Sequence, residues 1–159
     1  MKKNLKKLAI LALIGLFVVS FTACGDAKKE QEYKEQAESI ATSLGTSMTD
    51  LSTAMSSTKD YTNKEWQNKV LDEIAKVKAD SEKLRDLEAP EKYAEGQTKL
   101  KQGAESFIKA MDLYSEGFKA LQKGKTSTFS TKVLKGNDYL LEGSTAISDG
   151  ASLLDKAEK

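Results

Sequence analysis

The feature that most constrains this chain is a repeating apolar pattern that begins near residue 30 and continues almost to the C-terminus. Apolar residues recur at alternating spacings of four and three, which places them on one face of an α-helix. The single proline, Pro90, leaves room for long uninterrupted helices on both sides. The pattern therefore predicts an all-α fold built from amphipathic helices.

Two helical segments are expected before the proline. The first runs from about residue 28 to 57 and ends in a polar loop at residues 56–60. The second has a defined start, because Thr62 is a good N-cap and Glu65 completes a capping box with it. Tyr61 and Trp66 occupy the positions of a hydrophobic staple. The second segment ends before the proline, since the residue preceding a proline disfavours helix.

Two further segments are expected after the proline. Pro90 suits the first turn of the third helix, and Gly124 suits its C-terminal cap. A fourth helix begins between residues 126 and 128 and continues nearly to the chain end. Because every connection is short, neighbouring helices should be antiparallel. The sequence predicts an antiparallel up-down-up-down four-helix bundle with helices about 45 Å long.

Residues 1–23 have the organisation of a bacterial secretory signal. Residues 8–19 form an uncharged run of twelve residues, which is too short for a stable membrane span. Small or polar residues then lead to Ala23 and Cys24. The charges that precede the apolar run are all positive: Lys2, Lys3, Lys6 and Lys7.

The stretch Phe21-Thr22-Ala23-Cys24 resembles the lipobox of bacterial lipoproteins. In that family a diacylglycerol is attached to the cysteine sulfur before the signal is cleaved, here between Ala23 and Cys24. Leucine usually stands where this chain has Phe21. The alternative is an ordinary secretory signal or an N-terminal membrane anchor with an incidental cysteine. Against it, Cys24 is the only cysteine, so it can form no internal disulfide, and it stands where a lipobox requires it.

Taken whole, the chain is similar to small helical lipoproteins of Gram-positive bacteria. This family has no known catalytic residues that could be assigned to positions of this chain. The turn at residues 84–93 adds to this resemblance. The resemblance implies a signal peptide at residues 1–23, an acylated Cys24 with a tether at 24–32, and the bundle domain at 33–159. Two or three fatty acyl chains suffice for stable anchoring. We therefore expect the protein on the outer face of the cell membrane, bound to membrane lipid through Cys24.

Composition limits the chemistry. There is no histidine, which removes the commonest general base and metal ligand. Four of the 25 basic residues lie in the leader, leaving 21 against 24 acidic residues, a net charge of −3 that argues against nucleic acid. We expect no catalytic residues, no metal and no cofactor. Four acidic residues of the second segment are predicted to be solvated surface charges: Asp72, Glu73, Glu82 and Asp86.

The glycines form two series on the third and fourth helices, with members seven or fourteen residues apart: Gly96, Gly103 and Gly117, then Gly136, Gly143 and Gly150. Glycine inside a helix costs about 1 kcal/mol relative to alanine, so these glycines need a reason. Two interpretations are open. The glycines allow close backbone packing between the two helices, or they form a smooth groove that accepts a ligand or partner helix.

Two functions are compatible with these observations. The first is a non-catalytic helical interaction module in the cell envelope that binds another exported or membrane protein. The second is a binder of a small apolar or envelope-derived ligand within the bundle. A ligand binder should enclose an apolar cavity of a few hundred Å³. An interaction module should have a filled core and an exposed apolar patch.

Overall fold

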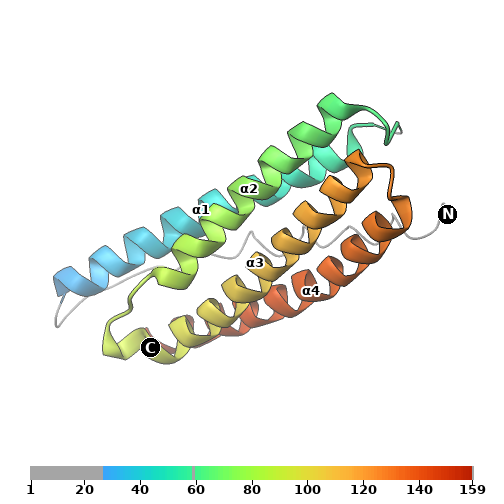
Figure 1. Ribbon diagram of the computed structural model, residues 1–159. Helices are drawn as coiled ribbons and strands as arrows, with labels where there is room; N and C mark the ends of the chain where they lie inside the picture. Colours follow the sequence, from blue (N-terminus) through green and yellow to red (C-terminus); the bar gives the residue numbers. More distant parts are fainter. Residues whose placement is uncertain (1–26, 59, 159) are drawn as a thin grey trace.

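The computed structural model describes residues 27–58 and 60–158, and the elements within these ranges are all helical (Figure 1). The predicted all-α four-helix fold is confirmed. Ala23 and Cys24 lie outside the described residues, as does the whole leader. The helices are α1 (Ala27–Ser56), α2 (Lys64–Asp86), the short 3₁₀ helix η3 (Glu91–Tyr93), α3 (Ala94–Gln122) and α4 (Thr126–Ala157).

The helices form two hairpins packed against each other, α1 with α2 and α3 with α4 (Figure 1). Close backbone contacts join α1 to α2, α2 to α3 and, most extensively, α3 to α4. Within the described residues, α1 and α4 have no Cα atoms within 8 Å of each other. The α3–α4 pair is therefore the tightest contact of the bundle.

Helix α2 begins one residue later than the predicted capping box requires. Its N-cap is Asn63, whose side-chain oxygen accepts the Trp66 backbone N–H at 3.0 Å. Thr62 instead donates both its N–H and its hydroxyl to the Asp60 carboxylate. The assignment of Thr62 as N-cap is therefore wrong, because Asp60 holds Thr62 in a turn and the next good capping residue takes its place. The contact predicted for the hydrophobic staple does form, because the Tyr61 and Trp66 rings pack edge-to-face with their centres 5.5 Å apart.

Pro90 lies before η3 and not in the first turn of α3, so that prediction is corrected. Helix α2 ends at Asp86, and both Leu87 and Pro90 have extended backbone angles. The Pro90 carbonyl accepts the Tyr93 N–H at 2.8 Å and closes the 3₁₀ turn. Proline has no N–H to donate and restricts the residue before it, so the chain stays extended up to Pro90.

Gly124 ends α3 as predicted, with a φ of +74°. Its N–H donates to the Leu121 carbonyl, and the Lys125 N–H donates to the Ala120 carbonyl, both at 2.9 Å. These two bonds make a Schellman motif, which satisfies the last carbonyls of the helix and requires a left-handed residue. The motif fixes the short turn into α4.

Apolar side chains of all four helices form the buried core, and the largest rings of the core place their polar atoms at its edge. The Trp66 indole N–H donates to the Ala54 carbonyl at 2.7 Å, which joins α2 to α1. The Tyr33 hydroxyl donates to Gln97 at 2.8 Å, and the Tyr114 hydroxyl donates to Asn137. The largest fully buried apolar side chains are Val70, Val77, Tyr93, Leu100, Met111, Tyr114 and Phe118.

Two carboxylates of α2 are buried. Glu73 was predicted to be a solvated surface charge, and that prediction is wrong, because only 9% of the residue is exposed and its partner is Lys76 at 3.0 Å. Asp80 is 5% exposed and accepts hydrogen bonds from Ser43 and Ser47 of α1. Burial alone would raise the pKa of Asp80, but hydrogen bonds from Lys83 and the two serines hold it below its usual value.

Candidate functional site

The glycine series of α3 and α4 face each other across the contact between these helices. A Cβ at Gly103 would lie 2.8 Å from the Gly143 carbonyl oxygen, and a Cβ at Gly143 would lie 2.9 Å from the Gly103 carbonyl oxygen. The pair Gly96 and Gly150 repeats this geometry at 3.1 and 2.9 Å. The two backbones touch at these points, so a side chain would have no room without helix separation.

Large core side chains fill the space beside the glycines. A Cβ at Gly143 would meet the Phe107 ring at 2.5 Å, and a Cβ at Gly136 would meet the Tyr114 ring at the same distance. Gly117 is less confined, since its nearest neighbour would be the Lys132 Cβ at 3.2 Å. All six predicted glycines are buried. This geometry favours close packing over an open groove at the glycines themselves.

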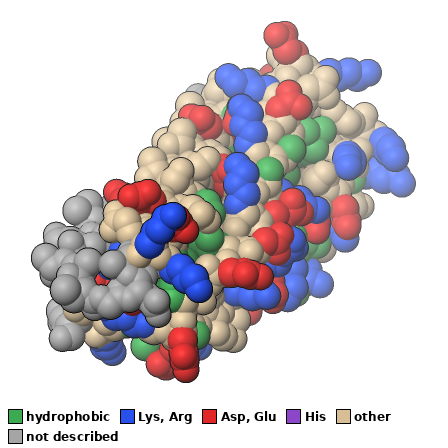
Figure 2. Space-filling view, turned by 90° about the vertical axis from the view of Figure 1, so that its left-hand side faces the viewer, with side chains coloured by type: hydrophobic (Ala, Val, Ile, Leu, Met, Phe, Trp, Pro, Cys, Tyr) green, Lys and Arg blue, Asp and Glu red, His purple; other side chains and the backbone are tan. Residues whose placement is uncertain are grey.

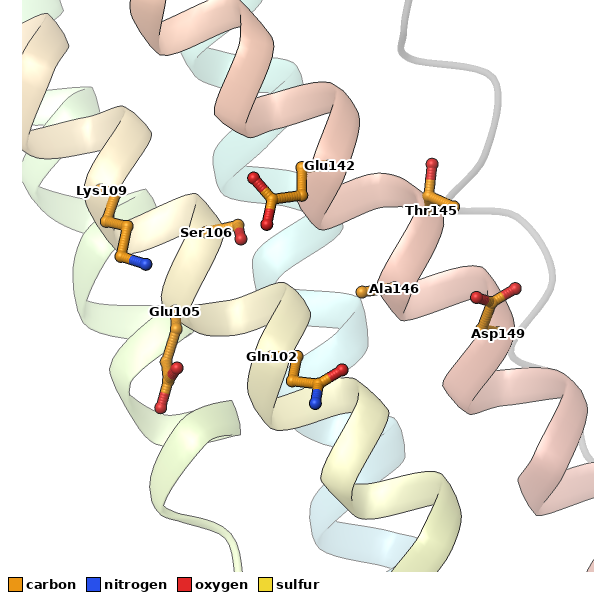
Figure 3. A pocket seen from close by; sticks show the side chains of 8 residues that line it. All are labelled: Gln102, Glu105, Ser106, Lys109, Glu142, Thr145, Ala146 and Asp149. Atoms are coloured by element: carbon orange, nitrogen blue, oxygen red, sulfur yellow. The ribbon is translucent and has the colours of Figure 1, made fainter.

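A groove does lie on the outer side of the same helix pair, away from α1 and α2 (Figure 3). Its volume is about 430 Å³, and it is open to solvent. Ser106 and Ala146 are its two smallest side chains. The groove is lined by Gln102, Glu105, Ser106 and Lys109 of α3 and by Glu142, Thr145, Ala146 and Asp149 of α4.

Ser106 is the unusual member of this groove. The residue is 4% exposed, and its hydroxyl makes no hydrogen bond within the described part of the chain. Ser81 and Ser144 are typical helical serines, each donating to the carbonyl four residues earlier at 2.8 Å. In Figure 3 the side chains of Ser106 and Glu142 point toward one another across the groove. The groove therefore contains a hydroxyl, on a nearly buried residue, that has no partner among the described residues and lines the open space.

The charge of the groove is negative. Glu105, Glu142 and Asp149 supply three carboxylates against the one ammonium of Lys109, a net charge of −2. Among the described residues none of these carboxylates forms an ion pair. The Lys109 ammonium lies 5.7 Å from the centre of the Tyr139 ring, which stabilises it where it is. Figure 2 shows one face of the molecule, on which both signs of charge are interspersed and hydrophobic side chains are visible only in small areas.

Two leucines of α4 are exposed in the turns that precede the groove residues of this helix. Leu134 is 57% exposed and Leu141 is 59% exposed, and they lie seven residues apart on one face of the helix. Leu141 directly precedes Glu142. The backbone carbonyl of Leu141 accepts a hydrogen bond from the Thr145 hydroxyl at 3.0 Å. We refer to the groove and these two leucines together as the α3–α4 surface.

The sequence analysis missed this surface. The signal that could have found it is the pair of apolar dipeptides Val133-Leu134 and Leu140-Leu141. Successive residues of a helix point about 100° apart, so a helix that buries the first member of each pair exposes the second. The repeated spacing of seven then places the two exposed side chains on one face.

A second polar cluster joins the two ends of the described chain. The ammonium of Lys34 in α1 lies 3.1 Å from the carboxylate of Glu158, just after α4, and both side chains are buried. The Tyr93 hydroxyl also donates to Glu158, and the Tyr93 ring stacks on Tyr33 at 5.3 Å. Burial alone would raise the pKa of Glu158, but hydrogen bonds from Tyr93 and Lys34 lower it. Burial raises the pKa of Tyr33 to about 12. The cluster fixes the start of α1 to the end of α4.

In the described ranges no group of three or more carboxylate, thiol or imidazole side chains could hold a metal ion. The helices of that same part of the chain are each too polar or too short to cross a bilayer.

These features define the class of the protein, an all-α antiparallel four-helix bundle with a glycine-mediated α3–α4 contact. The chain belongs to the family described as a domain of unknown function, DUF7018, whose model matches residues 26–144. The match contains the exposed Leu134 and Leu141 and all of the predicted glycines except Gly150. No curated protein and no solved structure shows significant similarity to the chain.

Proposed function

We propose that this chain is a lipid-anchored protein on the outer face of the cell membrane, where it binds another exported or membrane protein without catalysing a reaction. The observation that carries the proposal is the exposure of Leu134 and Leu141 on a bundle whose other large apolar side chains are mostly covered. Apolar side chains that gather on one exposed face mark interaction sites more often than isolated ones do.

The anchor is supported by the resemblance of residues 21–24 to a lipobox and by the lysine-rich, apolar leader before it. Helix α1 begins at Ala27, inside the segment assigned to the tether and three residues after Cys24. Three residues of any conformation span at most about 10 Å. An acylated Cys24 would therefore hold the bundle directly at the bilayer surface, and its partner would have to be reached there.

The packing of the bundle interior supports a protein partner over a ligand within the bundle. Met111, Tyr114 and Phe118 have no exposed surface. The backbone contacts at Gly103 and Gly143 leave no space for even a methyl group. The described cavity of this helix pair lies on the outside and is lined mainly by polar residues.

Site-specific photo-crosslinking in living cells tests the proposal. A photoreactive residue is placed at Leu141, or at the exposed control position Asp72 of α2, in the full chain with its leader. We expect a discrete crosslinked protein from Leu141 and none from Asp72. We also expect the product to disappear when Cys24→Ala prevents anchoring. Equal crosslinking from both positions, or a product that persists without the anchor, would contradict the proposal.

A further inference from the structure

We infer that the α3–α4 surface binds a basic amphipathic helix of the partner protein, with cationic side chains along the groove and apolar side chains over Leu134 and Leu141. This inference rests on the proposed function and adds the chemistry of the partner to it. It is carried by the shape of the groove, its negative charge, the Ser106 hydroxyl that lines it and the two exposed leucines.

The shape of the groove fits a helix. Two antiparallel helices form its walls, and the residues that line it span 102–109 on α3 and 142–149 on α4. Each span contains eight residues, and its first and last residues are about 10 Å apart along the helix axis. Ser106 and Ala146 have short side chains, so they leave space between the two walls. A third helix packs into such a space with one row of its own side chains.

The charge of the groove selects the partner's side chains. Glu142 and Asp149 lie one heptad apart, so their carboxylates repeat along α4 with a period of about 10 Å. Lysine or arginine residues repeating every seven positions on a partner helix would meet both carboxylates in one register. The Ser106 hydroxyl can accept a hydrogen bond from a cationic side chain that enters beside Glu142.

The exposed leucines repeat with the same period as the carboxylates. Leu134 and Leu141 are seven residues apart, as are Glu142 and Asp149, and all four residues are exposed on α4. A partner helix with an apolar row beside its basic row would cover the leucines and pair the carboxylates together. A second copy of this chain fits less well, because docking α4 against α4 would bring the carboxylates of both copies together.

A peptide-binding experiment tests this inference on the full chain purified in detergent. The first peptide is a fluorescent helix with leucine and lysine rows, each repeating every seven residues. The second has glutamate in place of every lysine. We expect fluorescence anisotropy to report binding of the lysine peptide only, and binding should weaken with added salt because the carboxylates are near the surface.

Three variants locate the binding site. Glu142→Lys and Leu141→Ser should each weaken binding of the lysine peptide by about tenfold, the ratio that corresponds to about 1.4 kcal/mol. Both residues are exposed, so neither change disturbs the core. Asp72→Lys, a matched charge reversal on exposed α2, should leave binding unchanged.

Equal binding of both peptides would overturn the inference. A Glu142→Lys variant that binds the lysine peptide as well as the parent does would also overturn it. Concentration-dependent self-association that Leu141→Ser abolishes would also overturn it, in favour of a second copy as the occupant. Crosslinking from Leu141 in cells together with any of these results would leave the proposed function standing and reject only the basic helix. Absence of that crosslink would reject the proposed function itself.

Discussion

Replacement of Gly143 is the most direct test of the α3–α4 contact. An added Cβ would lie 2.5 Å from Phe107 Cδ1, 2.6 Å from Cε1 of the same ring and 2.9 Å from the Gly103 carbonyl oxygen. Atoms at these distances must move apart. The Phe107 ring is itself buried at 4% exposure, and the carbonyl belongs to a helix backbone. Relief therefore requires that α3 and α4 separate.

The magnitude follows from two opposing terms. Overpacking a well-packed core costs about 1–3 kcal/mol. Alanine in place of glycine returns up to about 1 kcal/mol through helix propensity. Gly143→Ala should therefore lower the free energy of unfolding by about 1 kcal/mol. Gly143→Leu adds three more carbons to the same contact and should reach about 3 kcal/mol, or roughly 10 °C in the thermal midpoint.

Urea unfolding followed by circular dichroism measures these differences, and Gly117→Ala provides a matched control on α3. At Gly117 the nearest neighbour of a new Cβ would be 3.2 Å away, so alanine should cost less there than at Gly143. Gly103→Leu should behave as Gly143→Leu does, because the two glycines touch. If Gly143→Leu and Gly103→Leu unfold at or above the midpoint of the parent, the close-packing argument is refuted.

Three further predictions concern the anchor and the buried charges. Cys24→Ala should abolish metabolic fatty-acid labelling, and labelling that survives would reject the lipoprotein interpretation. The pKa of Glu158 is lowered in the fold, so its contribution to stability is present above its ordinary value of 4.5 and is lost as the pH falls through the lowered value. When the pH is lowered from about 7 to about 3, the free energy of unfolding of Glu158→Gln should therefore fall less than that of the parent, as measured by urea unfolding. Equal losses would show that the ion pair between Lys34 and Glu158 is not coupled to folding. Asp80→Ala removes the acceptor of the Ser43 hydroxyl and one of the two acceptors of the Ser47 hydroxyl, and it should lower the free energy of unfolding by about 1–3 kcal/mol. Asp72→Ala at an exposed position should change that free energy by less than about 0.5 kcal/mol, and equal effects would contradict the assigned burial.

The helices were predictable because their signals are local and repeated. The apolar spacing of four and three held along every helix, so it identified four segments and the short connections between them. Gly124 was predictable for the same reason, since a glycine after a long apolar stripe is a common helix end. The N-cap of α2 was not predictable, because the side chains of both Thr62 and Asn63 can cap a helix. Asn63 is the cap because Thr62 donates its hydrogen bonds to Asp60 in the preceding turn.

The buried charges could not be predicted from the spacing of one helix. Glu73 and Asp80 lie beside the apolar stripe of α2, where a carboxylate is normally solvated. Asp80 is buried because α1 brings Ser43 and Ser47 within hydrogen-bonding distance. These serines belong to a different helix from Asp80, and whether they reach it depends on how α1 and α2 are aligned. The outer groove was missed for a similar reason, since its walls belong to α3 and α4 together.

The glycine contact and the outer groove are two sides of one helix pair, and this connection leads to a last prediction. Gly103 and Gly143 set how closely α3 and α4 approach. Ser106 lies about one turn after Gly103, and Glu142 directly precedes Gly143. A wider contact would move Ser106 away from Glu142. Gly143→Ala should therefore weaken both folding and binding of the lysine peptide, whereas Glu142→Lys should weaken binding alone. Both quantities are measurable on the same purified chain by urea unfolding and fluorescence anisotropy. If Gly143→Ala destabilises the fold but binds the peptide as tightly as the parent does, the groove does not depend on the glycine contact, and the two features are independent.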